Sequence, residues 1–571
     1  MCGIIGYKGQ DGATDKIHRG LKKLEYRGYD SAGIAVSSNP SIKTEKGTGD
    51  VDQLEPGFDG DAGIGHTRWA THGGVTDENA HPHVSKSGKV AVVHNGIIEN
   101  HRELREKIGK HHFTSETDTE VIPHLLEKHL ERNNLREAVE KVISKLEGSY
   151  AVTAVLESGE MIAFRQDSPL VIGLKEEEYF IASDVNPFIE HTKDAVFLQN
   201  GDYAIIDEGL EIYNSGEMAD REVMEIEWDA EEASKEGFDH FMEKEIREQP
   251  ETVKRAVFQD KSDVEKSVEM IEDADRVFLT ACGTASFAAD MGAKYLREKG
   301  VEAYSEQAHE FEYQASQVNE EDLVIAVSQS GETADLLSAL DEVEPPVLSV
   351  TNVVGSTLAR NSDHNMYINA GPEIGVASTK AFTAQMTVLK LLSYSIDEGL
   401  EYARESLLET AGKVEEMLEK NEEEILKLSE YLAEKEDVYF IGRNKGRELA
   451  KEASLKLKEL SYIHSEAFPG GEFKHGTLSL IEEGVPVVAF TLDDKTNTLS
   501  NAVEASSRGA ELIGVGTENH EAFDHFIESP EDENREILEI IPFQFLAYET
   551  ALKRGNDPDK PRNLAKSVTV K

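Results

Sequence analysis

The stretch RVFLTACGTASFAADMGAKYLRE (276–298) decides the fold of the larger part of the chain. It begins with a short apolar run that ends at a Cys-Gly-Thr turn, and the residues after the turn have the spacing of an amphipathic helix. This order predicts a strand, a tight turn and a helix. The same pattern returns in DVYFIGRNKGRELAKEASLKLKE (437–459). A repeat of this kind predicts two similar domains in succession.

Each copy continues with further strands that alternate with helices. The matching segments are LVIAVSQSGET (323–333) and PPVLSVTN (345–352) in the first copy, and GVPVVAFTLDD (484–494) and AELIGVGTEN (510–519) in the second. Such alternation predicts a parallel sheet with crossover helices in each domain. We therefore expect α/β domains at 256–400 and 430–560, a long helical connection at 398–436 and a tail at 561–571.

The first 215 residues have a different pattern. Short strands such as VAVVHNGIIEN (90–100) and YAVTAVLE (150–157) are separated by glycine-rich turns, and two helical patterns lie among them at 101–108 and 117–131. This mixture predicts an α+β domain over residues 2–215. Residues 216–255 are acidic and less regular, and we interpret them as an inter-domain linker.

The composition excludes several classes of protein. The 571 residues include 59 Lys and Arg against 111 Asp and Glu, a net charge of −52, and two cysteines. So few cysteines argue against a disulfide framework and favour the cytoplasm. A chain this acidic lacks the basic patches that bind nucleic acid, and no run approaches the ~20 apolar residues of a membrane span. We hypothesise a halophilic host, because salt would screen the self-repulsion of an acidic surface.

The loop SQSGET (328–333) follows a predicted strand and should open a helix. Ser328, Ser330 and Thr333 supply hydroxyls, Gly331 lets the backbone approach a ligand, and a helix N-terminus attracts anions. An ordinary helix N-cap would have the same residue types. The second copy has TLDDKT (491–496) here, and its aspartates would repel a phosphate. Since the chain lacks GxxxxGK[ST] and GxGxxG, a sugar phosphate is favoured over a nucleotide; the loop resembles that of SIS (sugar isomerase) domains.

Other positions could carry chemistry, and each has a plain alternative. Cys2 stands directly behind the initiator methionine and is either an N-terminal nucleophile or a small buried hydrophobe. Lys456 and Glu459 share a helix face, either as a solvent-exposed ion pair or as a proton-transfer pair. His475 in a glycine-rich loop is either a surface residue or an acid/base. Lys566 is either solvated or desolvated enough to form a Schiff base.

Motifs along essentially the whole chain are similar to those of the glucosamine-6-phosphate synthase family, the isomerising glutamine–fructose-6-phosphate transaminases. The matching stretches are MCGIIGY (1–7), EYRGYDSAG (25–33), GHTRWATHG (65–73), NAHPH (79–83), HNGIIEN (94–100), SETDTE (115–120), SQSGETAD (328–335), EIGVASTKAFT (373–383), LKLKELSYIHSEAF (455–468), GEFKHG (471–476) and PRNLAKSVTV (561–570). The resemblance implies a class II glutamine amidotransferase domain with an N-terminal-nucleophile fold of stacked sheets between helices, followed by tandem SIS domains.

The resemblance also implies an activity. Glutamine would be hydrolysed to glutamate, and the ammonia would pass through a tunnel gated by Trp69 and convert fructose 6-phosphate to glucosamine 6-phosphate, the first step of amino-sugar synthesis. It implies a homodimer and no cofactor. His-Pro-His around His81 alone would suggest a metal site, but the family needs no metal there.

For the glutamine site, the resemblance implies removal of Met1, so that the free α-amino group of Cys2 acts as base for its own thiol. Asn95 and the Gly96 N–H would form the oxyanion hole. Arg68 would bind the α-carboxylate of glutamine and Asp118 the α-ammonium. The further pocket residues that it implies are Trp69, Thr71, His72 and His81.

For the sugar site, the resemblance implies a phosphate held by Thr284, Ser328, Gln329, Ser330 and Thr333, with Val376, Ser378 and Ala565 against the sugar. His475, contributed by a second subunit, would open the ring. Lys566 would form the Schiff base. Glu459 would move a proton from C1 to C2 with help from Lys456.

Two departures and three alternatives remain. Ala285 stands where the family has serine, and Thr477 where it has proline; both could alter affinity. The alternatives are a sugar-phosphate isomerase or deaminase that uses free ammonia, an SIS regulator and a purine-pathway amidotransferase. The intact glutamine-site motifs oppose the first, no DNA-binding helical domain accompanies the second, and tandem SIS domains oppose the third.

Overall fold

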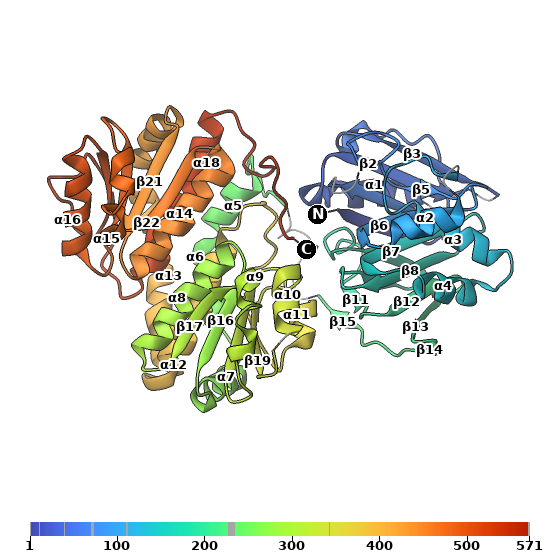
Figure 1. Cartoon of the computed structure of the whole chain (residues 1–571), viewed down its shortest axis with the longest axis horizontal. Helices are drawn as coiled ribbons and strands as arrows, with labels where there is room; N and C mark the ends of the chain where they lie inside the picture. Colours follow the sequence, from blue (N-terminus) through green and yellow to red (C-terminus); the bar gives the residue numbers. More distant parts are fainter. Residues whose placement is uncertain are drawn as a thin grey trace. The chain divides into compact units, whose positions relative to one another are not determined.

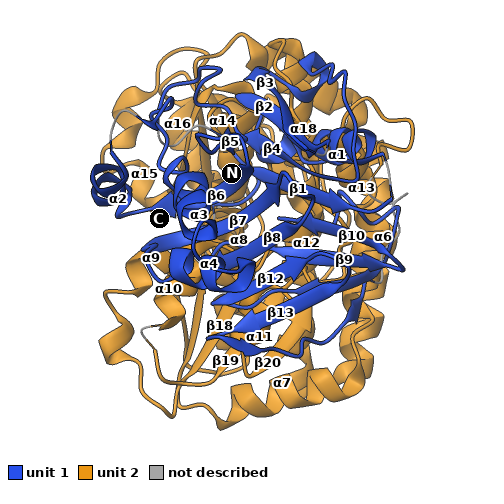
Figure 2. Ribbon diagram, turned by 90° about the vertical axis from the view of Figure 1, so that its right-hand side faces the viewer, with its two compact units in different colours: residues 1–233, 565–571 blue, residues 234–564 orange. Residues whose placement is uncertain are grey.

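The computed structural model describes residues 2–10, 12–38, 40–69, 73–109, 112–226, 234–341 and 343–568. The chain divides into two compact units, residues 1–233 with 565–571 and residues 234–564 (Figure 2). Each unit contains its own hydrophobic cores. Among the described residues, no helix is long and apolar enough to cross a membrane.

The first unit contains two largely antiparallel sheets. The first sheet has the order β15 (Met224–Glu225), β11 (Asp194–Phe197), β9 (Val171–Lys175), β10 (Glu178–Ala182), β1 (Gly3–Lys8), β4 (Ala62–Arg68), β2 (Ser31–Ser37) and β3 (Ile42–Thr48). The second has the order β14 (Glu217–Met218), β13 (Leu210–Asn214), β12 (Asp202–Ile206), β8 (Met161–Gln166), β7 (Gly148–Leu156), β6 (Val90–Ile98) and β5 (His83–Val84).

Alternating side chains hold these two sheets face to face. In β1, Ile4 lies in the core that contains residues of both sheets, whereas Ile5 and Tyr7 lie in the core on the opposite face. This follows from the two-residue period of a strand. Since every residue from Gly3 to Tyr7 is buried, β1 is covered on both sides.

Helices cover the outer faces of the sandwich (Figure 1). Helix α1 (Ala13–Lys22) packs on the first sheet through Ile17 and Leu21. Helices α2 (His101–Ile108), α3 (Val121–Leu130) and α4 (Leu135–Ile143) lie on the second sheet side. The layers helix, sheet, sheet, helix confirm the predicted N-terminal-nucleophile fold.

The second unit contains two five-stranded sheets in which every pair is parallel. Their orders are β17 (Ala303–Gln307), β16 (Val277–Ala281), β18 (Leu323–Ser328), β19 (Val347–Thr351), β20 (His364–Tyr367), and β22 (His464–Pro469), β21 (Asp437–Gly442), β23 (Pro486–Phe490), β24 (Glu511–Gly516), β25 (His525–Glu528). Both sheets thus have the strand order 2-1-3-4-5, which confirms the predicted duplication of an α/β domain.

The repeat extends to backbone angles. Gly283, before the first helix of the first copy, has φ 56° and ψ −137°. Asn444, at the matching place in the second copy, has φ 49° and ψ −119°. Left-handed φ values favour glycine and, among other residues, asparagine. The two copies therefore make the same strand-to-helix turn with different residues.

Helices surround both sheets of the second unit (Figure 1). They are α5 (Phe241–Arg247), α6 (Gln249–Val257), α7 (Lys261–Asp273), α8 (Thr284–Glu298), α9 (Ala308–Phe311), α10 (Ala334–Asp341), α11 (Thr357–Asn361), α12 (Lys380–Asp397), α13 (Leu400–Ala433), α14 (Lys445–Ser461), α15 (Gly470–Phe473), α16 (Lys495–Ser506), α17 (Arg535–Glu539) and α18 (Ile541–Lys553). One core runs through α8, α12, α13, α14 and α18, so the two copies share it. Helices α5 and α6, within the predicted linker, also pack into this core.

Asn421 in the long helix α13 pairs with the edge strand β25. Its Nδ2 donates to the main-chain oxygen of Glu528 at 3.0 Å, and its Oδ1 accepts from the Glu528 N–H at 2.9 Å. Asn421 is buried. One side chain thus satisfies both main-chain groups of an edge residue, which would otherwise be open for pairing with another chain.

We predict that Asn421→Ala lowers the free energy of unfolding of the second unit by about 2–4 kcal/mol, because it leaves two main-chain groups without these partners. Urea unfolding followed by circular dichroism measures the change. Glu419→Ala, on an exposed face of the same helix, is the control. Equal unfolding midpoints for the two variants would contradict this role.

Candidate active sites

The Cys2 thiol lies beside the end of β4. Strands β1 and β4 are paired with Gly3 opposite Thr67, which brings Cys2 next to Trp69. The Trp69 N–H donates to Sγ at 3.2 Å, and the thiol contacts the Trp69 carbonyl oxygen at 3.4 Å. Burial raises the pKa of Cys2, while the Trp69 N–H and the positive Arg68 oppose the rise. The thiol is thus held in place and needs a base to ionise it.

His66 orients the amide of Asn95 in strand β6 of the facing sheet. Nε2 of His66 lies 3.0 Å from the main-chain oxygen of His94 and 3.0 Å from Oδ1 of Asn95. A main-chain oxygen only accepts, so Nε2 carries the proton and donates to both oxygens. Burial lowers the pKa of His66 to about 3, and the ring is neutral. Asn95 must therefore turn its NH₂ group toward Cys2.

The Asn95 amide reaches the nucleophile directly. Its Nδ2 donates to the main-chain oxygen of Cys2 at 2.9 Å, which leaves the second N–H of the same nitrogen for a ligand. Gly96 follows with φ 116°, and a Cβ there would lie 2.1 Å from the Ser149 carbonyl oxygen. Only glycine fits this position. The two predicted oxyanion-hole residues are therefore fixed, one by a histidine and one by its own backbone.

Arg68 and Asp118 supply opposite charges in this unit. The Arg68 guanidinium donates to the carbonyl oxygens of Gly74 at 3.2 Å and Gly73 at 3.4 Å. Burial lowers the pKa of Arg68, and Cys2, Asp30 and Asp118 oppose the shift. Asp118 is buried and accepts the Ile98 N–H at 2.7 Å. A bound zwitterion could pair with both groups.

Of the remaining predicted pocket residues, Trp69 packs edge-on against Tyr29, with ring centroids 5.4 Å apart. Thr71 and His72 lie outside the described residues.

His81 belongs to a buried group of histidines behind Asn95. Its ring packs on His66 at 4.2 Å between centroids, and its Nε2 lies 2.9 Å from the Thr119 hydroxyl, which also contacts Nδ1 of His94 at 2.9 Å. His83 packs on His81 at 4.6 Å. Burial keeps the pKa values of His81 and His83 well below the ordinary value. In this arrangement His81 supports His66 from behind.

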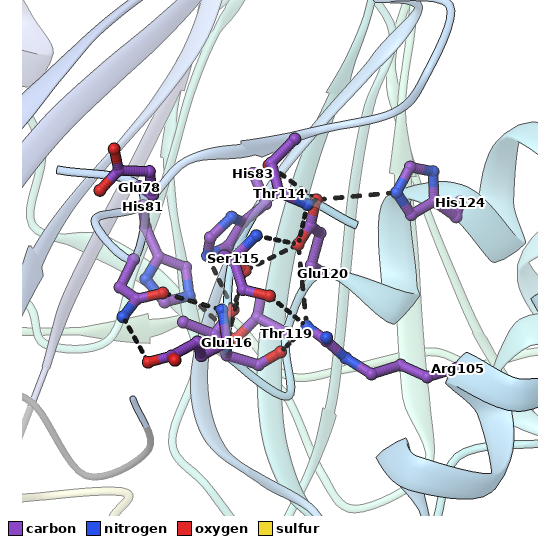
Figure 3. A network of polar contacts seen from close by, with 12 residues as sticks. Glu78, His81, His83, Arg105, Thr114, Ser115, Glu116, Thr119, Glu120 and His124 are labelled. Carbon is purple, nitrogen blue, oxygen red and sulfur yellow. Dashed lines mark hydrogen bonds and ion pairs between the residues drawn. The ribbon is translucent and has the colours of Figure 1, made fainter. Parts of the chain in front are cut away.

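Glu120 is the anion of this network (Figure 3). It accepts hydrogen bonds from the main-chain N–H and hydroxyl groups of Thr114 and Ser115, and Arg105 lies 3.7 Å away. Burial opposes ionisation, but hydrogen bonds from His124, Thr114 and Ser115 lower the pKa of Glu120 overall. Among the described residues, no group of three or more His, Cys, Asp or Glu is arranged to hold a metal.

The second unit buries a lysine between its two SIS copies. Lys456 is 1% exposed, and its Nζ donates to Thr284 Oγ1 at 3.0 Å and to Glu459 Oε2 at 2.8 Å. Thr284 begins α8 of the first copy, whereas Lys456 and Glu459 lie on α14 of the second. Burial opposes the charge, but nearby carboxylates outweigh it and raise the pKa of Lys456. The exposed ion pair weighed from the sequence is therefore wrong for Lys456.

Glu452 lies one helical turn before Lys456 and 3.5 Å from its Nζ. It is fully buried, and burial raises its pKa to about 8, although Lys456 opposes the rise. Glu452 is neutral below that pH. Glu459, with its Oε2 at 2.8 Å, is the closer carboxylate partner of Lys456.

The hydroxyls predicted to bind phosphate gather at the carboxyl end of β18. Ser328 Oγ accepts the Gly331 N–H at 3.0 Å and lies 3.3 Å from Thr333 Oγ1, and Ser330 Oγ accepts the Glu332 N–H at 3.2 Å. Residues 329–333 form a loop, and α10 begins at Ala334, slightly later than the sequence pattern indicated. Open α/β sheets bind ligands at this edge.

The neighbouring turn lacks one hydroxyl. Ala285 has none, and the next one, Ser286 Oγ, donates to the Gly283 carbonyl oxygen at 2.6 Å. Ser286 therefore does not replace the serine that the resemblance leads one to expect at residue 285.

The second copy fills the matching place with its own carboxylate. Strand β23 has the same place in its sheet as β18, so the loop from Leu492 to Asp494 that follows β23 lies where the first copy has its hydroxyls. Asp493 accepts the main-chain N–H of Lys445 at 2.8 Å and lies 3.4 Å from Lys445 Nζ. Asp494 caps α16.

The other predicted sugar-site residues lie in three segments. Val376 is buried and Ser378 partly buried in the loop before α12, and Gln329 is partly buried. His475 is exposed after α15, and its N–H donates to the Glu472 carbonyl oxygen at 2.9 Å. Ala565 and Lys566 belong to the segment that is grouped with the first unit. The roles of these residues stay predictions.

Sequence reasoning missed His66, Glu452 and Glu245. His66 stands in the quoted GHTRWATHG motif, and Glu452 precedes Lys456 by four residues, the helical spacing that places both on one face. Glu245, whose buried carboxylate accepts the N–H groups of Ile374 and Gly375, lies inside the predicted linker, and no motif in the sequence indicated it.

Comparison with known proteins agrees with both halves. A family model described as a glutamine amidotransferase domain matches residues 66–190, and a model described as an SIS domain matches residues 270–394 and 431–554. A glutamine–fructose-6-phosphate aminotransferase (isomerizing) of Thermococcus kodakarensis is 44% identical over 601 aligned residues, which cover all of both chains. The chain belongs to the isomerising glutamine–fructose-6-phosphate aminotransferase family. A relative of the same name from Clostridium tetani is 42% identical, again over all of both chains.

Solved structures agree for the second unit. The C-terminal domain of glucosamine-fructose-6-phosphate aminotransferase from Francisella tularensis is 34% identical, with a TM-score of 0.53, over 57% of this chain and 99% of that one. Membership of the aminotransferase family confirms the resemblance drawn from the motifs. It also accounts for an amidotransferase domain and two SIS domains in one chain.

We predict that the amidotransferase unit loses stability as the pH falls from about 6.5 toward 5. An unfolded histidine binds a proton below about 6.5, whereas His66 in the folded unit remains neutral to about pH 3. The unfolded state then binds more protons, so each such histidine costs up to about 1.4 kcal/mol per pH unit. This stability is fully present above about pH 6.5.

Urea unfolding at several pH values measures the effect. His83→Gln removes one buried histidine ring. The free energy of unfolding should then depend less steeply on pH, by the equivalent of about one bound proton. His309→Gln, at an exposed position in the other unit, is the control. The same slope in both variants would contradict the prediction.

Proposed function

We propose that this chain hydrolyses L-glutamine at Cys2 and uses the ammonia to convert D-fructose 6-phosphate into D-glucosamine 6-phosphate, with L-glutamate as the second product. One observation carries the proposal. A single chain holds a cysteine next to an oriented Asn95 amide, and a buried Lys456 that contacts Glu459 and Thr284. Thr284 follows β16, and the hydroxyl-rich loop follows the neighbouring strand β18. The first arrangement releases ammonia, and the second gives it a substrate.

In the glutaminase half, removal of Met1 gives Cys2 a free α-amino group, which takes the proton of the thiol. The thiolate attacks the side-chain amide carbon of glutamine. The second N–H of Asn95 Nδ2 and the Gly96 N–H stabilise the oxyanion, a contribution of about 3–4 kcal/mol per donor. The proton on the amine passes to the leaving nitrogen, ammonia departs, and water hydrolyses the thioester to glutamate.

Four further groups select the substrate. Arg68 binds the α-carboxylate of glutamine and Asp118 its α-ammonium; Thr71 and His72 complete the pocket. Trp69, next to the nucleophile, gates the ammonia path.

In the isomerase half, Thr284, Ser328, Gln329, Ser330 and Thr333 hold the sugar phosphate, with Val376, Ser378 and Ala565 against the sugar. His475 opens the ring. Lys566 forms a Schiff base with C2 of the open ketose, and ammonia displaces the lysine. Glu459 then moves a proton from C1 to C2, and hydroxyl oxidation at C1 balances imine reduction at C2, which gives the 2-amino aldose.

Lys456 and Glu452 lie next to this base on α14. The Lys456 ammonium donates to Glu459 Oε2 at 2.8 Å and so holds the carboxylate in place. A neutral Glu452 does not compete for the ammonium. We further propose a homodimer in the cytoplasm, in which the exposed His475 serves the site of the second subunit.

Two variants separate the halves. Incubation of the protein with glutamine and fructose 6-phosphate should yield glucosamine 6-phosphate. Cys2→Ala should abolish glutamine-dependent product and keep product formation from ammonia, because it removes only the nucleophile. Glu459→Gln should lower amino-sugar formation about 10²–10⁴-fold and spare glutaminase activity. Mass spectrometry and a glutamate assay measure both. Full turnover of glutamine by Cys2→Ala would overturn the mechanism.

Glu452 should set an alkaline limit to amino-sugar formation. Its pKa of about 8 means that it gains a charge above that pH and competes for Lys456. Activity should therefore fall above about pH 8, and Glu452→Gln, which stays neutral, should lack this fall. Glu448→Gln, one turn earlier on α14, is the control and should keep it. Equal pH profiles for Glu452→Gln and the wild type would contradict this role.

A further inference from the structure

Two buried carboxylates shape the loop from Glu373 to Thr379, here named the sugar loop. Glu373 Oε1 accepts the N–H groups of Thr379 at 2.8 Å and Ala381 at 3.0 Å. Glu245 Oε1 accepts those of Ile374 at 2.5 Å and Gly375 at 3.1 Å. Glu373 lies within the loop, whereas Glu245 comes from α5, more than a hundred residues earlier. The loop therefore depends on a distant helix for part of its shape.

The Glu245 carboxylate is buried and lies close to the backbone of the sugar loop. Glu245 is 2% exposed, and a Cβ on Gly375 would lie 2.9 Å from its Oε2, so the carboxylate lies against a backbone that has no side chain. Hydrogen bonds to a charged acceptor in such surroundings are stronger than in water. Loss of Glu245 would leave two buried N–H groups without this acceptor, an expensive change.

The other end of α5 is fixed by the last part of the unit. Asp559 Oδ2 accepts the Phe241 N–H at 2.9 Å, and its Oδ1 accepts the Met242 N–H at 3.0 Å. Asp559 is buried and precedes the predicted tail by two residues. Just beyond it, the Arg562 N–H donates to the Tyr462 hydroxyl at 2.7 Å, at the end of α14. Thus α5 contacts the segment just before the tail at one end and the sugar loop further along.

We propose that α5 is a bridge that positions the sugar loop from the segment just before the tail: Asp559 fixes α5, and Glu245 on α5 fixes the backbone at residues 374 and 375. Glu245 and Asp559 are positioning residues, since neither is placed against substrate. The consequence for catalysis rests on the proposed function, through Val376 and Ser378, which follow these two residues. The bridge itself is a property of the fold and is testable without substrate.

Hydrogen exchange on the full-length protein tests the bridge. In Glu245→Ala and Asp559→Ala, peptides that contain residues 374 and 375 should exchange about tenfold faster or more. Glu251→Ala is the control, because Glu251 is exposed and pairs only with Lys254 among the contacts described. Unchanged exchange in Asp559→Ala would overturn the proposal. So would equally faster exchange in β16 and β18, because that would show general destabilisation.

Steady-state kinetics tests the consequence. Both single variants should raise KM for fructose 6-phosphate about tenfold and change kcat by less than about threefold, with glutaminase activity unchanged. Because Asp559 acts through Glu245, the double variant should be no worse than the worse single variant. Glu245→Gln keeps an accepting oxygen and should restore KM to within about threefold. Multiplied effects in the double variant, or failure of Glu245→Gln to rescue, would overturn the bridge.

The two experiments also separate this proposal from the proposed function. If the wild type made no amino sugar but Asp559→Ala still accelerated exchange at residues 374 and 375, the function would fail and the bridge would stand. If the wild type made amino sugar and exchange did not change, the bridge would fail alone.

Discussion

The ammonium group of Lys456 is buried where the two SIS copies meet, and a buried charge is stable only with partners in good geometry. Its partners come from both copies: Thr284 begins the first helix of one, and Glu459 lies on α14 of the other. The surroundings of this lysine therefore depend on both copies. In the proposed function, one copy supplies the phosphate loop and the other supplies the proton-transfer groups.

The amidotransferase unit differs from the second unit in the charge of its buried side chains. There the histidine behind the nucleophile is kept neutral, since burial holds the pKa of His66 at about 3. A neutral ring with its proton on Nε2 can orient the Asn95 amide, whereas a charged ring among other histidines would repel its neighbours. The positive charge near Cys2 is instead that of Arg68, which a substrate carboxylate can use. The histidine that orients Asn95 is thus neutral, whereas the side chain of Arg68 near Cys2 is charged.

The sequence predicts most elements because their periods are local. The helix expected at 101–108 is α2, and the strands expected near 90–100 and 150–157 are β6 and β7. The motifs also predicted a glutamine amidotransferase domain followed by two SIS domains. What the sequence could not predict depends on long-range contacts: the tautomer of His66 is set by His94 and Asn95, and Glu245 acts on residues far along the chain. The periodicity and spacing of residues along the sequence do not indicate such long-range hydrogen-bond partners.

Asp493 supports the prediction that only the first of the two similar copies binds a phosphate. In the first copy, the strand-to-helix turn ends at Thr284, and the loop after β18 offers hydroxyls without charge. In the second, the matching turn ends at Lys445, and Asp493 accepts its main-chain N–H at 2.8 Å. Because this carboxylate is part of the chain, its effective concentration at the Lys445 N–H is high, and a free phosphate would have to displace it. The negative charge of the carboxylate would also repel the phosphate. The same contact fixes the first turn of α14, the helix that carries Glu452, Lys456 and Glu459. Where the first copy has hydroxyl groups, the second copy thus has a carboxylate that supports the start of α14.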